Sequence, residues 1–522
     1  MRRSTLQRKD RDELTEIATA LGRKPGSRAR KGEIIDMILD LAAGGDGAVG
    51  GDDAAESEPA ESEDAATSHE AAASDAGNDD AGNDDSGDDD SGDDDSSDDD
   101  SGDDANNAAG SAADGKTEPG NRRRRRRGRD RETRSEGTEA WDGVPSPVEG
   151  LLDLRPEGYG FIRVNGLLAS RDDTYVPVKL VRQFGLRKGD VVSGPSRPAN
   201  RNEKNPALIS VETVNGGSVE QATDRPEFEH LTPVQPTSLL TLERSADRED
   251  LTGRLIDLLA PLGKGQRGLI VAPPRSGKTR LLRDVVRSIE TNHPDVHLIV
   301  LMVDERPEDV SEFRSALVHG ELIASTFDRP ADEHIALAEV TVERAKRMVE
   351  SGRDVVLIVD GITRLVRAYN QEAVPSNRTL AGGLEPAAVY PIKRFLSAAR
   401  AVAEGGSLTM LSTVLADSGS VLDDTIGEEF FATANQQLRL DQRAAMRRMH
   451  PALDVGRTVT NREDLLVDES AGAARQALHS AIGELLDSVG PVGALAALTE
   501  QVAATANNDQ FLREVASRGL AS

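Results

Sequence analysis

The sequence predicts a multidomain protein with a small helical N-terminal unit, a small β-barrel and a large α/β domain built on a parallel sheet. Three observations support this fold class. The composition changes abruptly near residues 45, 146 and 226. Short apolar runs separated by turn residues fill the middle of the chain, and continuous apolar strands alternate with helical patterns after it. A chain of 522 residues has room for about three or four domains.

Residues 1–44 are expected to form the helical unit. Gly22, followed by Lys24, Pro25 and Gly26, separates two helices. Two sets of apolar residues recur at helical spacing, namely Leu14, Ile17, Ala18 and Leu21, and then Ile34, Ile35, Ile38, Leu39 and Leu41.

Residues 45–145 are expected to be a disordered insertion, acidic and then Arg-rich. Residues 45–120 hold 27 Asp or Glu and one Lys, which is −26 of the net charge of −29, so the rest of the chain is close to neutral. This stretch has too few large apolar side chains to fold. Six arginines follow at 122–127, with three more by residue 134. That basic tract can be a self-neutralising linker, an RNA contact or a contact for a protein partner.

Residues 146–225 predict a five-strand barrel, because short apolar runs alternate with Gly, Pro, Asn and Asp. The runs are 148–154, 161–164, 174–178, 190–193 and 207–214.

Residues 226–522 predict the α/β domain, with a parallel sheet covered on both faces. Helices are expected from Gly277, after Pro307 and up to Val349. The expected strands are 269–271, 297–304, 322–327, 355–360 and 407–415.

Some classes of protein are excluded by composition. The chain has no cysteine, so it forms no disulfide, thiolate metal site or cysteine nucleophile. The N-terminus lacks the apolar core of a signal peptide. The longest apolar run, 298–303, is far shorter than the about 20 residues of a membrane helix. We expect a cytoplasmic protein without a membrane partner.

Residues 272–279, Ala-Pro-Pro-Arg-Ser-Gly-Lys-Thr, follow the phosphate-loop pattern G-x-x-x-x-G-K-[ST] except for Ala272 at the first glycine. A strand precedes the loop and a helix follows it, so backbone N–H groups at the helix start can hold phosphates. Lys278 would reach the β- and γ-phosphates, and Thr279 would bind Mg²⁺.

Two further strands end in carboxylates. Asp360 closes an apolar strand and is expected beside the Mg²⁺ site. Glu305 closes another strand, where a carboxylate can orient water for attack on the γ-phosphate. The alternative for Asp304 and Glu305 is that they cap the helix that begins at Pro307.

Six segments together closely resemble the bacterial transcription termination factor Rho family. The resemblance covers residues 1–44 and about 146–522, and not 45–140. The segments are 157–163 (EGYGFIR), 268–279 (GLIVAPPRSGKT), 304–308 (DERPE), 360–370 (DGITRLVRAYN), 404–409 (EGGSLT) and 417–420 (DSGS).

The resemblance implies a ring hexamer with a RecA-like ATPase domain that moves 5′→3′ along nascent RNA, unwinds RNA–DNA duplexes and releases RNA from RNA polymerase. Lys278, Thr279, Glu305 and Asp360 match the family's phosphate, Mg²⁺ and water-activating positions. Arg462 matches an arginine finger supplied in trans, and Arg306 matches an arginine that links subunits. The implied ATP contacts are Pro274, Arg275, Ser276, Gly277, Lys278, Thr279, Arg280, Arg306 and His450.

The resemblance also implies two RNA sites, a primary site on an OB or cold-shock-like barrel and a secondary site on two pore loops. The alternatives are that Tyr159 and Phe161 belong to the core and that the loops are plain surface turns. The implied primary contacts are Tyr159, Phe161, Arg163, Tyr175 and Lys204. The implied secondary contacts are Thr379, Gly382, Gly383, Ser418, Gly419 and Ser420.

The chain departs from the family pattern at several positions. Val421 stands where a pore-loop lysine is common, and Asn205 where an aromatic is common. Arg280 and His450 replace the Met and Phe that often sandwich adenine. We hypothesise that the basic tract at 122–134 compensates for weaker primary contacts. Deleting 45–140 should then lower RNA affinity at several salt concentrations.

Two other functions compete with this one. A rotary-ATPase-like subunit shares the fold, but it would lack the helical unit and the stacking aromatics. A non-motor RNA-binding scaffold would use the charged tracts and an inactive core. Intact Lys278, Glu305 and Asp360 argue against inactivity, and RNA-stimulated hydrolysis discriminates among the three.

Overall fold

The computed structural model describes parts of two units, 1–127 and 128–522, which are treated separately. The described residues are 14–15, 18–19, 31–32, 34–35, 37–38, 143–200, 203–244 and 250–520. The expected insertion up to residue 142, with its basic tract, lies outside them.

The described residues of the first unit are all helical, as the sequence predicted. Five apolar side chains are buried together there, namely Leu14, Ala18, Ile34, Ile35 and Ile38. Ile17, Leu21, Leu39 and Leu41 lie outside the described residues.

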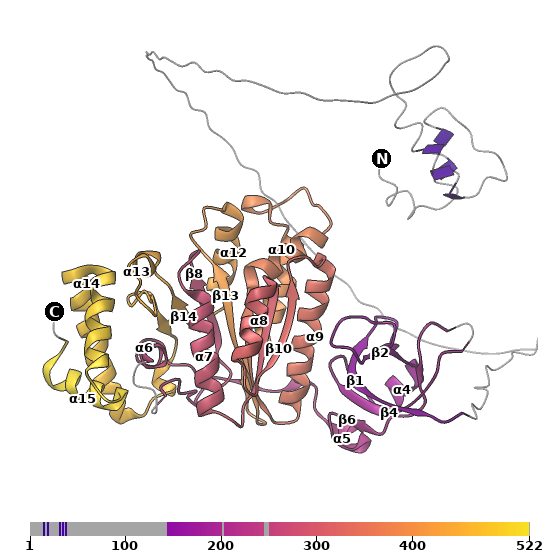
Figure 1. Cartoon of the computed structure of the whole chain (residues 1–522), viewed down its shortest axis with the longest axis horizontal. Coiled ribbons are helices and arrows are strands. Elements are labelled where there is room, and N and C mark those ends of the chain that lie inside the picture. The colour runs from indigo at the N-terminus through magenta and orange to yellow at the C-terminus, as the bar shows by residue number, and fades with distance from the viewer. Residues whose placement is uncertain are drawn as a thin grey trace, which may run out of the picture. The chain divides into compact units, whose positions relative to one another are not determined.

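The barrel domain is a single sheet in which β1 also pairs with β4, so that the sheet closes on itself (Figure 1). Its strand order is β1-β2-β3-β5-β4-β6. Leu152, Ile162, Val176 and Val192 fill its core. The elements are β1 (Ser146–Leu154), β2 (Gly160–Arg163), β3 (Thr174–Val176), α4 (Val178–Gln183), β4 (Val191–Arg197), β5 (Ala207–Leu208), β6 (Thr213–Val214) and α5 (Val219–Asp224).

The predicted barrel is confirmed, but the limits of all five expected runs differ from those of the strands, and β4 continues four residues further, to Arg197. Two differences go beyond a shift of a strand end. Val178 begins α4 instead of ending a strand. The run 207–214 is split into β5 and β6. Close packing accompanies this break, because a Cβ on Gly194 would lie 2.1 Å from the carbonyl oxygen of Ser210. Between the two short strands the N–H groups of Ile209 and Glu212 still donate to β4, so the break is a local irregularity of the ladder.

The α/β domain has a parallel sheet in the order β10-β9-β11-β13-β8-β14, which β15 extends antiparallel. Its strands are β7 (Pro233–Val234), β8 (Arg267–Ala272), β9 (His297–Glu305), β10 (Glu321–Thr326), β11 (Asp354–Asp360), β12 (Arg400–Val402), β13 (Ser407–Leu415), β14 (Gln436–Arg439) and β15 (Val459–Thr460). Its helices are η1 (Phe228–His230), α6 (Leu251–Leu259), α7 (Lys278–Asn292), α8 (Pro307–Ala316), α9 (Ala331–Glu350), α10 (Ile362–Glu372), η2 (Ala381–Gly383), α11 (Pro386–Ser397), α12 (Val421–Phe431), α13 (Gln442–Met446), η3 (Glu463–Leu465), α14 (Glu469–Ala503) and α15 (Asn508–Arg518).

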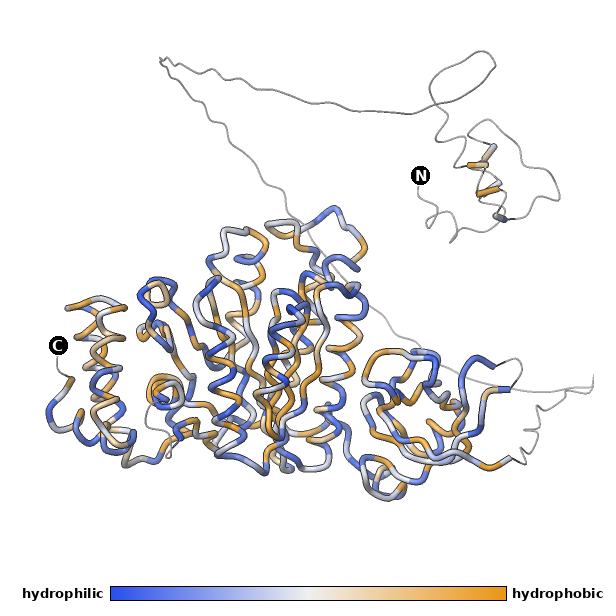
Figure 2. The backbone as a smooth tube through the Cα atoms, in the orientation of Figure 1, coloured by the Kyte–Doolittle hydropathy of each residue, from blue (hydrophilic) through white to orange (hydrophobic). Residues whose placement is uncertain are grey.

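Two hydrophobic cores cover the two faces of this sheet, which confirms the predicted arrangement. Successive strand residues alternate between them. Ile270, Val300 and Ile358 join the core that includes α6, α7, α14 and α15. Val271 and Val359 join the core that includes α9, α10 and α11. Figure 2 shows apolar residues running along these strands. Because the strands are parallel, β8, β9, β11 and β13 present their carboxyl ends at one edge.

One described helix, α14, is long and apolar enough to span a membrane by length and composition, over 471–503. Its backbone leaves the helical region at Gly490, where φ is 71° and ψ is 175°, and Pro491 follows. Leu478, Ile482 and Leu495 pack into the core of the α/β domain. The break at Gly490 therefore divides α14 into two shorter helical pieces, and apolar side chains of both pieces pack into the core of the α/β domain.

Candidate nucleotide site and RNA-binding surfaces

The phosphate loop joins β8 to α7 at the carboxyl edge of the sheet. Gly277 precedes the helix with a φ of 89°, which favours glycine. Ser276 Oγ donates to the carbonyl of Pro273 at 2.7 Å and holds the turn. Pro274 is partly buried and Arg275 is exposed. The first N–H groups of α7 thus follow a tight turn, as an anion site at a helix start requires.

Lys278 connects two buried carboxylates from neighbouring strands. Its Nζ lies 3.3 Å from Glu305 Oε1, and it also forms an ion pair with Asp360. Glu305 is 4% exposed and Asp360 is 1% exposed. The ammonium group of Lys278 contacts both carboxylates and offsets their mutual repulsion. The structure therefore brings together three residues that lie far apart in the sequence.

The donor set around Asp360 fits a magnesium ion. Asp360 Oδ1 accepts from Lys278 and, at 2.8 Å, from Thr413 Oγ1. Asp360 Oδ2 is buried and has no hydrogen-bond partner in the structure. Thr279 is partly buried in the first turn of α7. Within the described residues no three acidic or His side chains gather as a metal cage. Mg²⁺ does not need one, because it commonly takes one or two protein ligands plus phosphates and waters.

Arg364 contacts Glu305 and was not singled out from the sequence. Its Nη1 lies 2.7 Å from Glu305 Oε1, and it also donates to the carbonyl of Asp304. The residue lies in the first turn of α10, four positions after Asp360. That spacing within the 360–370 motif is the signal that could have pointed to it.

A second cluster lies beside the phosphate loop. His450 Nε2 donates to Asp284 Oδ2 at 2.7 Å, and Thr252 Oγ1 donates to the same oxygen at 3.0 Å. Burial raises the pKa of Asp284, but these hydrogen bonds and the nearby Arg280 charge outweigh it, so the pKa is lowered overall. His450 Nδ1 would lie 4.0 Å from a Cβ on Gly277. His450 is therefore placed near the phosphate loop.

Two predicted arginines lie on the surface of this chain. Arg306 is exposed at the N-cap of α8. Arg462 is exposed, has a φ of 55°, and pairs with Asp464 at 2.9 Å. Neither position joins the cluster of Lys278, Glu305 and Asp360 in the same chain.

Three predicted aromatic residues form one cluster on the barrel. The ring centroids of Tyr159 and Tyr175 lie 5.7 Å apart, and each lies 5.9 Å from that of Phe161. All three are partly exposed and none belongs to the barrel core. Neighbouring rings at a surface form a platform on which bases can stack.

Arg163 differs from the aromatic residues. Its side chain is 5% exposed, and its guanidinium pairs with Asp153 and Asp173. It lies 5.9 Å from the Phe161 ring. Arg163, which the resemblance implies as an RNA contact, thus lies buried between two carboxylates beside the aromatic cluster. Lys204 is exposed.

The two predicted pore loops meet each other. A Cβ on Gly382 would lie 2.5 Å from the backbone of Leu422, so only a glycine lets them approach this closely. In the second loop, Ser418 Oγ donates to Asp423 Oδ2 at 2.6 Å. Thr379, Gly383 and Gly419 are exposed, and Ser420 is partly exposed. The second loop follows β13 and therefore lies at the same sheet edge as the phosphate loop.

Comparisons with known proteins match both domains. Residues 253–460 match the nucleotide-binding domain of the ATP synthase alpha/beta family, and residues 148–220 match the RNA-binding domain of Rho termination factor.

Several curated relatives cover most of the chain. It is 45% identical over 394 residues to transcription termination factor Rho of Mycobacterium tuberculosis strain H37Rv, which is 74% of this chain and 64% of that protein. It is 47% identical over 375 residues to Rho of Streptosporangium roseum, covering 72% and 93%. It is 44% identical over 366 residues to Rho of Salmonella typhimurium, covering 70% and 86%. The chain thus spans just under two thirds of the mycobacterial relative.

Proposed function

Because this chain belongs to the Rho family of transcription termination factors, we propose that it is an ATP-driven RNA motor that ends transcription. It binds nascent single-stranded RNA, hydrolyses ATP while moving 5′→3′, separates RNA from DNA and releases the transcript from RNA polymerase. It works in the cytoplasm as a ring of six subunits. Its domains are the helical unit 1–44, the insertion 45–145, the RNA-binding barrel 146–225 and the ATPase domain 226–522.

The observation that carries this proposal is the meeting of Lys278, Glu305 and Asp360 at one edge of the sheet. In the proposed reaction, Lys278 contacts the β- and γ-phosphates of ATP, and the loop N–H groups surround them. Glu305 accepts a hydrogen bond from the attacking water and orients it toward the γ-phosphate. Positioning and charge neutralisation supply most of the catalysis in such a site.

The unpartnered Asp360 Oδ2 and the hydroxyl of Thr279 are the groups that would hold Mg²⁺. The ion would neutralise phosphate charge. His450 lies near the phosphate loop and Arg280 follows it in the first turn of α7, and both can stack on the adenine.

The exposed positions of Arg306 and Arg462 support contacts across a subunit interface. In the proposed ring, Arg462 reaches the ATP of the neighbouring subunit. Such a finger contributes about 10³–10⁵ in rate. Arg306, next to Glu305 in the chain, links the neighbouring subunit to the same site.

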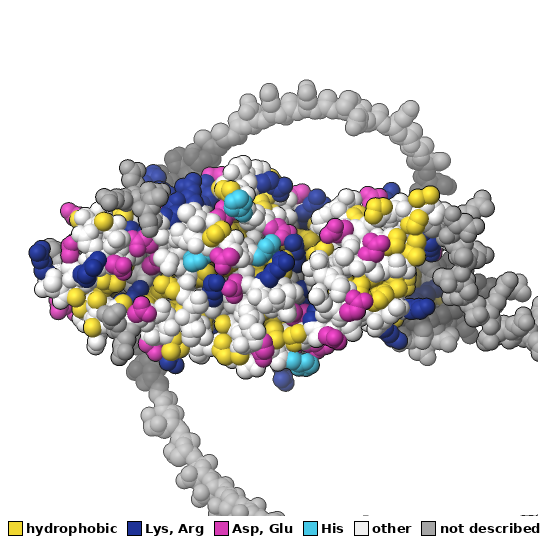
Figure 3. Space-filling model, turned by 90° about the horizontal axis from the view of Figure 1, so that it is seen from below, with side chains coloured by type: hydrophobic (Ala, Val, Ile, Leu, Met, Phe, Trp, Pro, Cys, Tyr) yellow, Lys and Arg dark blue, Asp and Glu magenta, His cyan; other side chains and the backbone are white. Residues whose placement is uncertain are grey.

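RNA binds two surfaces in this proposal. Tyr159, Phe161 and Tyr175 stack bases at the primary site, and Lys204 contacts a phosphate. The loops that carry Thr379, Gly382, Gly383, Ser418, Gly419 and Ser420 contact RNA in the pore. Acidic and basic side chains are interspersed on the face seen in Figure 3.

The barrel domain is the feature that distinguishes an RNA motor from a rotary-ATPase subunit. Both would share the nucleotide-binding core that matches residues 253–460. The matching RNA-binding model at 148–220 and the exposed aromatic cluster favour RNA.

The test is ATP hydrolysis by the purified full chain with and without cytidine-rich RNA. We expect RNA to raise turnover strongly, and Lys278→Ala to abolish it while RNA binding persists. Binding of RNA without any hydrolysis would reject the motor and favour a scaffold. Hydrolysis that ignores RNA would favour a rotary-type subunit.

A further inference from the structure

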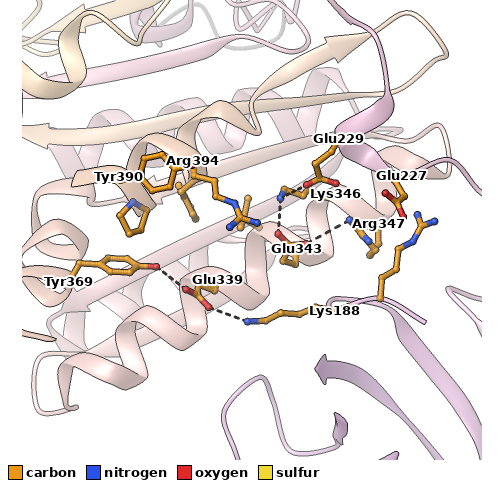
Figure 4. A pocket seen from close by; sticks show the side chains of 14 residues that line it. Lys188, Glu227, Glu229, Glu339, Glu343, Lys346, Arg347, Tyr369, Tyr390 and Arg394 are labelled. Atoms are coloured by element: carbon orange, nitrogen blue, oxygen red, sulfur yellow. Dashed lines mark hydrogen bonds and ion pairs between the residues drawn. The ribbon is translucent and has the colours of Figure 1, made fainter. Parts of the chain in front are cut away.

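A pocket of about 610 Å³ lies where the barrel meets the ATPase domain, and it is lined by none of the site residues proposed above (Figure 4). Lys188 lines it from the barrel side. Glu339 on α9, Tyr369 on α10, and Tyr390 and Arg394 on α11 line it from the other side. Its volume is in the range of pockets that take small ligands.

Most charges in the pocket neutralise one another, although Glu227 pairs only with His230 among the described residues, at 3.5 Å. Lys188 Nζ lies 3.1 Å from Glu339 Oε2, and Lys346 Nζ lies 2.7 Å from Glu343 Oε1. Among the cations of the pocket Arg394 is the exception: it is exposed, and its guanidinium makes no hydrogen bond or ion pair within the described part of the chain. One cation is therefore available to an incoming anion.

An exposed aromatic ring stands beside that cation. Tyr390 is 72% exposed, although large aromatic side chains are usually covered. It precedes Arg394 by four residues on α11, so both lie on one helix face. Tyr369 donates its hydroxyl to Glu339 Oε1 at 3.1 Å, and burial raises its pKa, which keeps the phenol neutral. Figure 4 shows Tyr369, Glu339 and Lys188 in line, with Tyr390 and Arg394 beside them.

This set of groups matches the parts of a nucleotide. A base can stack on the free face of Tyr390, and a phosphate can pair with Arg394. The carboxylate of Glu339 can accept from an exocyclic amino group.

Contacts connect the pocket with both proposed RNA surfaces. On the barrel side, Lys188 Nζ lies 3.8 Å from Asp153, which pairs with Arg163 beneath the Phe161 ring. On the other side, Tyr369 precedes Asn370, whose Nδ2 donates to the carbonyl of Gly383 at 3.2 Å. The pocket thus lies between the aromatic cluster and a pore loop.

We propose that this pocket is a third RNA contact, which holds one nucleotide of single-stranded RNA on its way from the barrel to the pore loops. The proposal rests on the proposed function, since it assumes that both surfaces bind RNA.

The test uses the full chain and the variants Tyr390→Ala and Arg394→Gln. Lys393→Gln is the matched control: it removes a neighbouring charge from the same helix, but Lys393 pairs with Glu429 on α12 at 2.6 Å and does not line the pocket. Affinity is measured for a short cytidine oligomer of about 10 nucleotides, which one barrel can hold, and for a long cytidine-rich RNA. Photo-crosslinking to RNA that carries thiouridine maps the contact.

We expect each pocket variant to weaken long RNA about 10-fold, as the loss of one stacked base would, and to leave the short oligomer unchanged. Crosslinks should include Tyr390 or its neighbours on α11. Thermal unfolding should not change, because both side chains are exposed. The control should behave as the wild type.

Equal long-RNA affinity of variants and wild type, or crosslinks that avoid α11, would overturn the third contact. This outcome is separate from failure of the motor proposal, which would appear as wild-type hydrolysis that RNA does not stimulate. The binding and crosslinking results test the RNA contact at the pocket whether or not RNA stimulates hydrolysis.

Discussion

The guanidinium of Arg364 lies 2.7 Å from the carboxylate of Glu305, Nη1 to Oε1. This contact joins the start of α10 to the end of β9. The far end of α10 carries Asn370, which bonds both the carbonyl of Gly383 and the N–H of Glu385. One helix therefore touches the proposed water-orienting group and a proposed RNA loop.

We predict that Arg364 positions Glu305. In Arg364→Ala the carboxylate can rotate, and kcat should fall about 10²-fold, the cost of a small misplacement of a catalytic group. The KM for ATP should change much less, and Arg364→Lys should restore part of the rate. Steady-state kinetics with saturating RNA measures both. A change confined to KM would contradict a positioning role.

The contact between the two pore loops gives a paired prediction. Gly382→Ala places a methyl group 2.5 Å from the Leu422 backbone, whereas Gly383→Ala meets nothing within 4 Å. Both glycines have positive φ, 70° and 79°, so both variants carry similar backbone strain. We expect Gly382→Ala alone to lose most RNA stimulation while barrel binding of RNA persists. Equal behaviour of the two variants would show that strain, and not the loop contact, matters.

The aromatic cluster and Lys204 should affect RNA binding in different ways. Removing one ring, for example Phe161→Ala, should cost about 1–3 kcal/mol of binding and leave the salt dependence nearly unchanged. Lys204→Ala should lower the slope of log affinity against log salt by about 0.7, the value for one phosphate of a single strand. Titrations at several salt concentrations separate the two effects.

The buried Asp257 should give a pH-dependent contribution to stability. Burial raises its pKa to about 7 from 3.8, although the N–H groups of Leu242 and Glu243 and the charge of Arg475 act in the opposite direction. Between pH 3.8 and about pH 7, Asp257 is protonated in the folded state and ionised in the unfolded state. The stability that Asp257 contributes therefore falls as the pH rises through this range.

Asp257→Asn cannot titrate and serves as the reference. The stability of the wild type relative to this variant should fall by about 2–3 kcal/mol from about pH 5 to about pH 8. Denaturant unfolding of both proteins at the two pH values measures it. A constant difference would mean that Asp257 is ionised throughout.

Local patterns were enough to predict the phosphate loop and five strands of the α/β domain, whereas the short strands β7, β12, β14 and β15 were not predicted. The expected strand at 407–415 matches β13, and 355–360 differs from β11 by one residue. Such strands are continuous apolar runs because both faces of a parallel sheet are buried. The limits of the barrel strands were less predictable, since Val178 and the break between β5 and β6 depend on contacts with residues elsewhere in the barrel.

By itself, the sequence determined the fold class, the order of the domains and the residues that stand at strand ends, because periodicity and turn residues are local. Only the tertiary structure decided that Arg163 is buried between two carboxylates, that Arg364 reaches Glu305, and that a pocket opens beside Tyr390. These depend on side chains far apart in the chain, whose packing and electrostatic pairing no local pattern encodes.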